Sequence, residues 1–162
     1  MSQSSITIEH VHLTADKPFE KFTAAFEQQL GLFDPSAYKE LEGGGDPQAT
    51  KARLESMVGP SGFMLFRTSN HGLLLRIVGK PRKAMQYLLG KPLFAIEMTQ
   101  HAIGAALYAP LRVLIYEAEE GKSCVEYDLP SSLFGQFGDE HVDRMAESLD
   151  RKLEELVASA AR

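Results

Sequence analysis

Two apolar runs, residues 111–118 and 122–128, constrain the fold of this chain more than any other feature. Both runs are rich in β-branched and aromatic residues, so they predict the two strands of a hairpin. The loop between them, Glu119-Glu120-Gly121, is a favoured three-residue connection with glycine at its left-handed position. This loop places Arg112 opposite Asp128. It also creates one apolar face, which consists of Leu111, Val113, Ile115, Val125 and Tyr127.

The same register determines where the polar side chains of the hairpin lie. It pairs Leu114 with Glu126 and Tyr116 with Cys124. A two-residue loop would instead mix polar and apolar residues on both faces, which buried sheets avoid. We therefore expect Arg112 to project from the face opposite the helices, beside Asp128 and Glu126.

The other elements are predicted from periodicity and from glycine and proline boundaries. Residues 73–78 are apolar on both faces, which is typical of a central strand, and they follow a turn at Ser69-Asn-His-Gly72. A stripe of apolar residues makes the last helix the most strongly patterned element. Strands are expected over 5–13, 63–68 and 73–78, and helices over 16–30, 46–58, 80–89, 92–101 and 139–160.

This order, β-α-α-β-β-α-α-β-β-α, predicts an α+β fold. Hairpins require antiparallel pairing, and each helix has only one apolar stripe, so an antiparallel sheet with helices packed on one face satisfies both constraints. The length of 162 residues suits a single domain over residues 1–162. Residues 34–62 are less regular, and we interpret them as an insertion that contains a short helix.

Three segments carry a family resemblance: Tyr87-Leu-Leu-Gly-Lys-Pro-Leu93, Ala106-Leu-Tyr-Ala-Pro-Leu-Arg-Val-Leu-Ile-Tyr-Glu117 and Val125-Glu-Tyr-Asp-Leu-Pro-Ser-Ser-Leu-Phe-Gly-Gln-Phe137. With them the chain resembles the bacterial family catalogued as domain of unknown function 302, from Val11 through the last helix. The resemblance implies a curved five-stranded antiparallel sheet of the TATA-binding-protein-like kind. It implies no chemistry, and relative to shorter members the 43–60 region looks inserted.

Composition and charge exclude several classes of protein. The net charge of −5 opposes nucleic-acid binding, and the short basic cluster Lys80, Arg82 and Lys83 is interpreted as a solvated helix start. A single cysteine, Cys124, cannot form an internal disulfide. No apolar run approaches the roughly 20 residues that span a bilayer, and the N-terminus lacks signal-peptide features. We therefore expect a cytoplasmic protein with neither nucleic acid nor membrane as a partner.

Histidines and methionine offer one possible route to metal or haem chemistry. His10 and His12 lie two apart on a strand, so their side chains point the same way, and His71 could join them only through the fold. Met98 and His101 are three apart on an expected helix. A structural metal site normally needs four ligands, and no haem attachment motif is present, so surface histidines and a core methionine are the simpler interpretation. No metal ligand and no cofactor is therefore assigned.

Other familiar motifs are incomplete. Gly43-Gly44-Gly45-Asp46 precedes a helix but lacks the Lys-Ser/Thr of a phosphate-binding loop, so it is interpreted as a linker. Cys124 has no signature of a thiol nucleophile. Ser131-Ser132 lacks the Gly-x-Ser-x-Gly elbow of serine hydrolases.

Two features remain as candidates for function. Arg112 either pairs with Asp128 across the hairpin or anchors an anion, since its guanidinium binds carboxylate or phosphate bidentately. The apolar 130–138 loop, with Leu133, Phe134 and Phe137, covers the core, forms a dimer contact or lines an apolar pocket.

Together these features predict a small-molecule-binding module, whose ligand is partly apolar with an anionic group as an option. The expected ligand-binding residues are Arg112, Tyr108, Tyr116, Phe134 and His101. The alternative is a metal- or haem-dependent enzyme that uses some of the histidines, so enzymatic activity is left undecided. A homodimer through the 130–138 loop is a further expectation.

Overall fold

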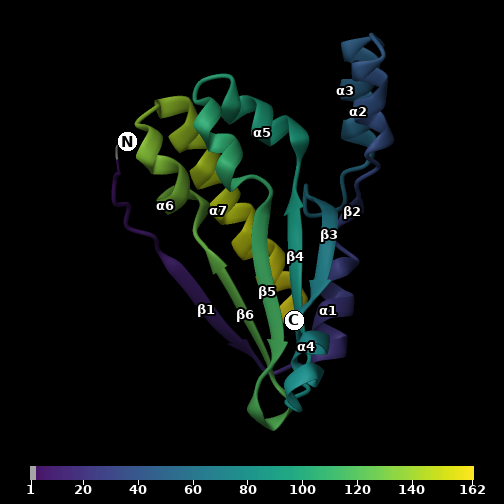
Figure 1. Ribbon diagram of the computed structural model, residues 1–162, viewed down its shortest axis with the longest axis vertical. Coiled ribbons are helices and arrows are strands. Elements are labelled where there is room, and N and C mark those ends of the chain that lie inside the picture. The colour runs from purple at the N-terminus through teal and green to yellow at the C-terminus, as the bar shows by residue number, and fades with distance from the viewer. Residues whose placement is uncertain (1–2) are drawn as a thin grey trace.

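A mixed six-stranded sheet forms the centre of the protein in the computed structural model, which describes residues 3–162 except for the side chain of Glu120 (Figure 1). The strand order is β1-β6-β5-β4-β3-β2, and all neighbours are antiparallel except β2 and β3. The strands are β1 (His10–Ala15), β2 (Gly31–Leu32), β3 (Met64–Asn70), β4 (Ala84–Gly90), β5 (Leu111–Glu117) and β6 (Ser123–Asp128).

The α+β class is confirmed, but the expectation of five antiparallel strands is wrong. Residues 31 and 32 add the two-residue strand β2, which runs parallel to β3 at one edge of the sheet. So short a run has no periodicity that could reveal it. The TATA-binding-protein-like curvature and the single-domain interpretation stay predictions.

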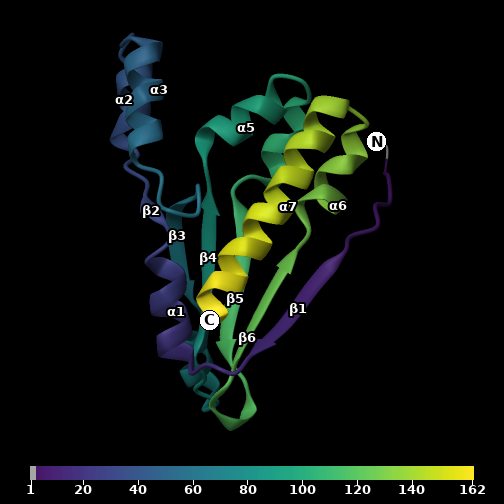
Figure 2. The same cartoon turned by 180° about the vertical axis from the view of Figure 1, so that it is seen from behind.

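Two helices cover one face of the sheet, α1 (Phe19–Glu27) and α7 (Glu140–Ala161), as Figure 2 shows. α7 begins where Asp139 accepts hydrogen bonds from the amides of His141 and Val142, which is the cap that helix N-termini favour. Its buried stripe packs against the apolar side chains of β4, β5 and β6. The buried residues of this layer include Phe22, Phe26, Tyr87, Val113, Ile115, Val125, Val142, Ala146, Leu149 and Leu153.

The second hairpin has the expected register. Leu114 pairs with Glu126 and Tyr116 with Cys124, as the three-residue loop predicts. The five side chains of its apolar face are all buried. Arg112 is exposed on the other face of the sheet, which α1 and α7 leave uncovered and which we call the open face.

The first hairpin differs from its prediction. Residues 73–78 form no strand: they belong to the helical turn α4 (His71–Leu74) and a 3-10 helix (Leu75–Val78). Asn70 begins this turn by accepting a 2.8 Å hydrogen bond from the Leu73 amide. The central strand is instead β4, which was predicted as a helix over 80–89. Such short apolar runs fit both the period of a helix and that of a strand. The pairing of β4 with β3 and β5 is what makes residues 84–90 a strand.

The basic cluster that precedes β4 is correspondingly not a helix start. Lys83 forms ion pairs with Glu20 at 2.7 Å and Glu117 at 2.8 Å, which connect β4 to α1 and β5. The Arg82 guanidinium lies 5.9 Å from the ring centroid of Tyr116. Both residues directly precede β4, which begins at Ala84.

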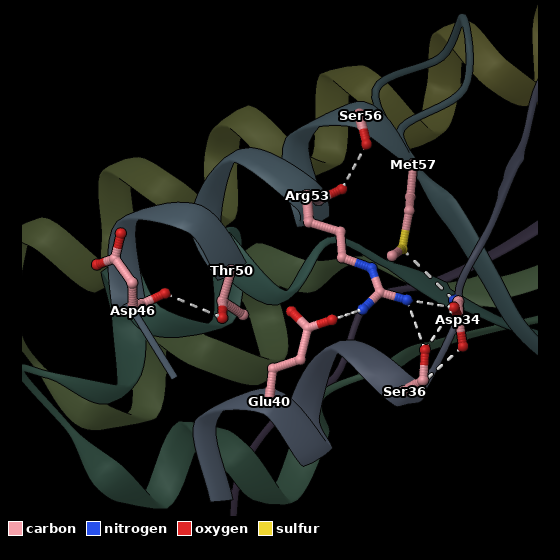
Figure 3. A network of polar contacts seen from close by, with 8 residues as sticks. All are labelled: Asp34, Ser36, Glu40, Asp46, Thr50, Arg53, Ser56 and Met57. Atoms are coloured by element: carbon pink, nitrogen blue, oxygen red, sulfur yellow. Dashed lines mark hydrogen bonds and ion pairs between the residues drawn. The ribbon is translucent and has the colours of Figure 1, made fainter. Parts of the chain in front are cut away.

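Two helices, α2 (Ser36–Glu42) and α3 (Pro47–Ser56), form an arm that extends from one end of the sheet. The helix at Asp46-Pro47 was expected, and α2 was not. Figure 3 shows how Arg53 of α3 connects the two helices: it donates to Glu40 and Ser36 of α2 and to Asp34 just before it. That the arm is an insertion stays a prediction.

A cluster of helices lies at the end of the sheet opposite α4. It contains α5 (Pro92–Thr99), the 3-10 helix Ile103–Tyr108, α6 (Pro130–Phe134) and the 3-10 helix Gly135–Phe137. The remaining 3-10 helix, Glu119–Gly121, forms the loop between β5 and β6. The expected 130–138 loop is thus helical, and Leu133 and Phe134 are buried in their own chain. In the described part of the chain, no helix is both long enough and apolar enough to span a bilayer.

Candidate functional site

A groove on the open face combines an apolar floor with polar side chains. It has a volume of about 470 Å³ and lies between the α4 turn and strands β4, β5 and β6. Leu75, Ala84 and Leu114 supply apolar surface, and the polar lining residues are His71, Arg82, Gln86, Tyr116 and Glu126. The alternation of side chains along β4 and β5 explains the location, because the residues between these face the core.

A network of polar contacts borders the groove on the side of β1. The Tyr116 hydroxyl donates to Glu126 at 2.6 Å, and the other carboxylate oxygen of Glu126 lies 3.3 Å from Nε2 of His10. Nδ1 of His10 lies 2.8 Å from Oδ1 of Asp128. His12 Nε2 lies 3.5 Å from the Tyr116 hydroxyl. Side chains of three neighbouring strands are thereby held in fixed positions.

The network shifts the pKa values of its members. The hydrogen bond from Tyr116 lowers the pKa of Glu126, and the same bond raises the pKa of Tyr116 because it stabilises the neutral phenol beside a carboxylate. The hydrogen bond to Asp128 raises the pKa of His10. Around neutral pH the network therefore holds an ionised carboxylate next to a neutral phenol.

Arg112 lies next to the groove but does not form the cross-strand pair considered from the sequence. Asp128 contacts His10, and the side chain of Arg112 makes no hydrogen bond or ion pair with any residue that the structure describes. Arg112 and Leu114 are two apart on β5, so their side chains leave the same face about 7 Å apart. Its guanidinium is thus free for an anion at the edge of the groove.

Comparison with known proteins identifies the family. The sequence matches the family described as Domain of unknown function DUF302 over residues 39–160. The chain belongs to the DUF302 family. A crystal structure of an uncharacterized conserved DUF302 protein from Bacillus stearothermophilus superimposes with a TM-score of 0.64 at 12% identity, covering 93% of this chain and 97% of that one. At this identity the likeness shows the fold alone. No curated protein matches the chain.

The structure separates the expected ligand-binding residues of this DUF302 protein into three places. Arg112 and Tyr116 lie on the open face. Tyr108 packs edge-on against Phe134 with ring centroids 6.1 Å apart, on the other side of the sheet. His101 stacks on His141 at 4.3 Å, near the start of α7. These five residues therefore do not form one site.

Phe134 lines a second, smaller pocket of about 140 Å³ near α5. Most of its walls are apolar, and Tyr38 of the arm contributes to them. Leu133 and Phe134 are buried within their own chain, so they cannot provide the expected dimer contact, whereas Phe137 is only partly buried. A homodimer as such stays a prediction, which sedimentation of a dilute sample tests against the 17.9 kDa monomer mass.

The candidate haem or metal residues are also dispersed. His10 and His12 lie on β1, whereas Met98 is buried in α5 and lines the smaller pocket. His71 lies at the groove. Among the residues whose side chains the structure describes, no group of three or more His, Cys, Asp or Glu residues is arranged to hold a metal ion.

Residues of the motifs that were interpreted as incomplete make contacts that stabilise the fold. Cys124 is buried, with its sulfur 3.5 Å from the Thr14 hydroxyl. The hydroxyl of Ser132 donates to the Leu129 carbonyl and accepts from the Glu9 amide. Asp46 caps α3 by accepting from two backbone amides.

The sequence did not predict that the segment 71–86 lines a groove. Leu75, Ala84 and Gln86 were assigned to the wrong elements, so their common face could not be deduced. Asn70-His-Gly72 was the available signal, because asparagine is a strong helix N-cap residue.

Proposed function

We propose that this DUF302 protein is a small-molecule-binding module, and that its ligand occupies the open-face groove. The observation that carries the proposal is the groove of about 470 Å³. Its volume lies within the range usual for ligand sites, and such sites are mostly apolar with a few directed polar groups. The perturbed pKa values of Tyr116 and Glu126 at its border add support, since such shifts concentrate at functional sites.

The ligand that fits this surface is partly apolar and anionic. Its apolar part would lie on Leu75, Ala84 and Leu114. Its anionic group would face Arg112, whose guanidinium has no partner among the described residues. Glu126 does not oppose this arrangement strongly, because Tyr116 and His10 occupy its oxygens. Tyr108, Phe134 and His101 lie outside the proposed site.

Fluorescence titration with anilinonaphthalene sulfonate, an aromatic sulfonate, tests the proposal. We expect Leu114→Glu to abolish groove binding, because it places a carboxylate on the apolar floor. Arg112→Gln should weaken binding about tenfold, the loss expected for one charge-assisted hydrogen bond. Arg67→Gln is the matched control, because Arg67 is exposed on β3, two strands away from Arg112.

A neutral probe separates the two parts of the proposal. Phenylnaphthylamine has no anionic group, so its binding should be sensitive to Leu114→Glu and insensitive to Arg112→Gln. Thermal melts of each variant check that the fold is intact. If Leu114→Glu leaves the binding of both probes unchanged, the groove is not the ligand site and the proposal fails.

A further inference from the structure

Four large aliphatic side chains are exposed together where the chain passes from β3 to β4. Leu73 is 53% exposed, Leu74 58%, Ile77 84% and Val78 65%. All four lie on α4 and the following 3-10 helix, and we call them the apolar corner. Figures 1 and 2 show α4 at the end of the sheet opposite α5 and α6. A partner bound at the apolar corner would therefore not contact α5 or α6.

The apolar corner lies in a strongly basic segment of an acidic chain. No Asp or Glu occurs between Glu55 and Glu97, although the chain has a net charge of −5. The basic residues of this interval are Arg67, Arg76, Lys80, Arg82, Lys83 and Lys91. Positive charge is therefore concentrated in the segment that exposes the aliphatic side chains.

Two of these cations are available to a partner. Arg76 lies between Leu74 and Ile77, and Lys80 follows Val78 by two residues. The side chain of neither residue makes a hydrogen bond or ion pair with any residue that the structure describes. Lys83, in contrast, is paired with Glu20 and Glu117. Two cations without a side-chain partner, Arg76 and Lys80, therefore adjoin the apolar corner.

We propose that the apolar corner, with Arg76 and Lys80, docks on an anionic lipid bilayer. Aliphatic side chains on short helical turns can enter the boundary between headgroups and acyl chains, and adjacent basic residues are attracted to anionic headgroups. Binding to an anionic bilayer requires exposed apolar side chains next to positive charge, and the apolar corner provides both. The proposal goes beyond ligand binding in the groove, and it revises the sequence-based expectation that no membrane is a partner.

The shape of the surface favours a bilayer over a peptide. A helical peptide is usually bound in a concave apolar groove, whereas the apolar corner consists of outward-facing side chains on two successive helical turns. A second copy of the chain would find the same positive charge opposite its own, because a two-fold contact brings identical patches together. A contact between copies would appear as a dimer when the protein is sedimented without lipid.

Cosedimentation of the 162-residue chain with vesicles tests the proposal. The vesicles are phosphatidylcholine alone, or phosphatidylcholine with phosphatidylglycerol in equal parts. We expect binding to the anionic vesicles only, weakened by added salt because the attraction is electrostatic. Ile77→Ser with Val78→Ser should lower the partition coefficient more than tenfold. Arg76→Gln with Lys80→Gln should lower it about fivefold for each charge removed.

The matched control is Ile103→Ser with Leu107→Ser. These two side chains are 79% and 80% exposed but lie at the opposite end of the sheet, so their loss should leave vesicle binding unchanged. The proposal is overturned if the protein binds neither vesicle, if it binds both equally, or if the control variant loses binding as well. It is also overturned if sedimentation without lipid shows a dimer that Ile77→Ser with Val78→Ser dissociates, because the apolar corner would then be a contact between copies.

Discussion

The hydroxyl of Tyr116 donates a 2.6 Å hydrogen bond to Oε1 of Glu126, across the paired strands β5 and β6. This bond keeps the phenol neutral and the carboxylate ionised, and it fixes both side chains at the border of the open-face groove. The open face therefore presents an ordered polar edge beside an apolar floor, and the proposed binding function depends on that combination.

The first prediction concerns the pKa of His10. The hydrogen bond to Asp128 raises this pKa above its ordinary value of 6.5, with a smaller contribution from Glu126. Asp128→Asn removes the charge and should lower the pKa of His10, while Asp150→Asn, remote from His10 on α7, should not change it. Titration of the imidazole resonances by NMR measures both. An unchanged His10 pKa in Asp128→Asn would show that the pair does not form in solution.

The same shift gives a pH dependence of stability. A raised folded-state pKa means that the contribution of His10 is fully present below pH 6.5 and is lost as the pH rises through the folded-state value. As the pH rises from 6.5 to the folded-state pKa of His10, the free energy of unfolding of the native protein should fall more steeply than that of Asp128→Asn. The effect is small, because His10 is half exposed to solvent.

The second prediction tests the corrected connection between β3 and β4. A Cβ added to Gly72 would lie 2.1 Å from the carbonyl oxygen of Arg82, so the α4 turn can approach β4 only with glycine here. Gly72→Ala should lower the free energy of unfolding by about 2 kcal/mol, as expected for overpacking against backbone. Chemical denaturation measures this loss.

Gly135→Ala is the control for this substitution. No atom lies within 4 Å of a Cβ at Gly135, and its φ of −58° suits alanine, so the change should be neutral or slightly stabilising. If Gly72→Ala were equally harmless, the α4 turn would not lie against Arg82 as described.

The third prediction concerns the arm. Arg53 joins α3 to Glu40, Ser36 and Asp34, as Figure 3 shows. Arg53→Ala should cost about 1 kcal/mol or less, because the partners are largely exposed. Amide hydrogen exchange in residues 36–56 should accelerate about fivefold, and exchange in β4 and β5 should stay unchanged. Lys51→Ala, on the same helix, is the control, and equal exchange in both variants would contradict the role of Arg53.

The sequence predicts most of the elements whose pattern is local. The β5–β6 hairpin follows from its loop and its alternation, and α7 follows from its long apolar stripe. Residues 73–90 were mispredicted because the apolar run 73–78 satisfies the pattern of a buried strand yet is exposed, whereas Ala84–Gly90 becomes central only through pairing with two distant strands. Long-range pairing of this kind leaves no signal in a short window.

The candidate site was predictable to the same extent. Arg112 and Tyr116 could be placed on the open face, because the hairpin register alone decides their direction. Tyr108, Phe134 and His101 could not be separated from them, since their positions depend on how α5 and α6 pack against the sheet. The groove itself requires α4 to lie over β4, which only the tertiary fold provides.

The most direct test of the central claim is an NMR titration of the isotope-labelled protein with anilinonaphthalene sulfonate. If the ligand occupies the open-face groove, the largest amide shift changes will map to Ala84, Gln86, Leu114 and Tyr116. Changes centred instead on Phe94, Met98 and Phe134 would place the ligand in the smaller pocket and contradict the account, and so would the absence of any localised change.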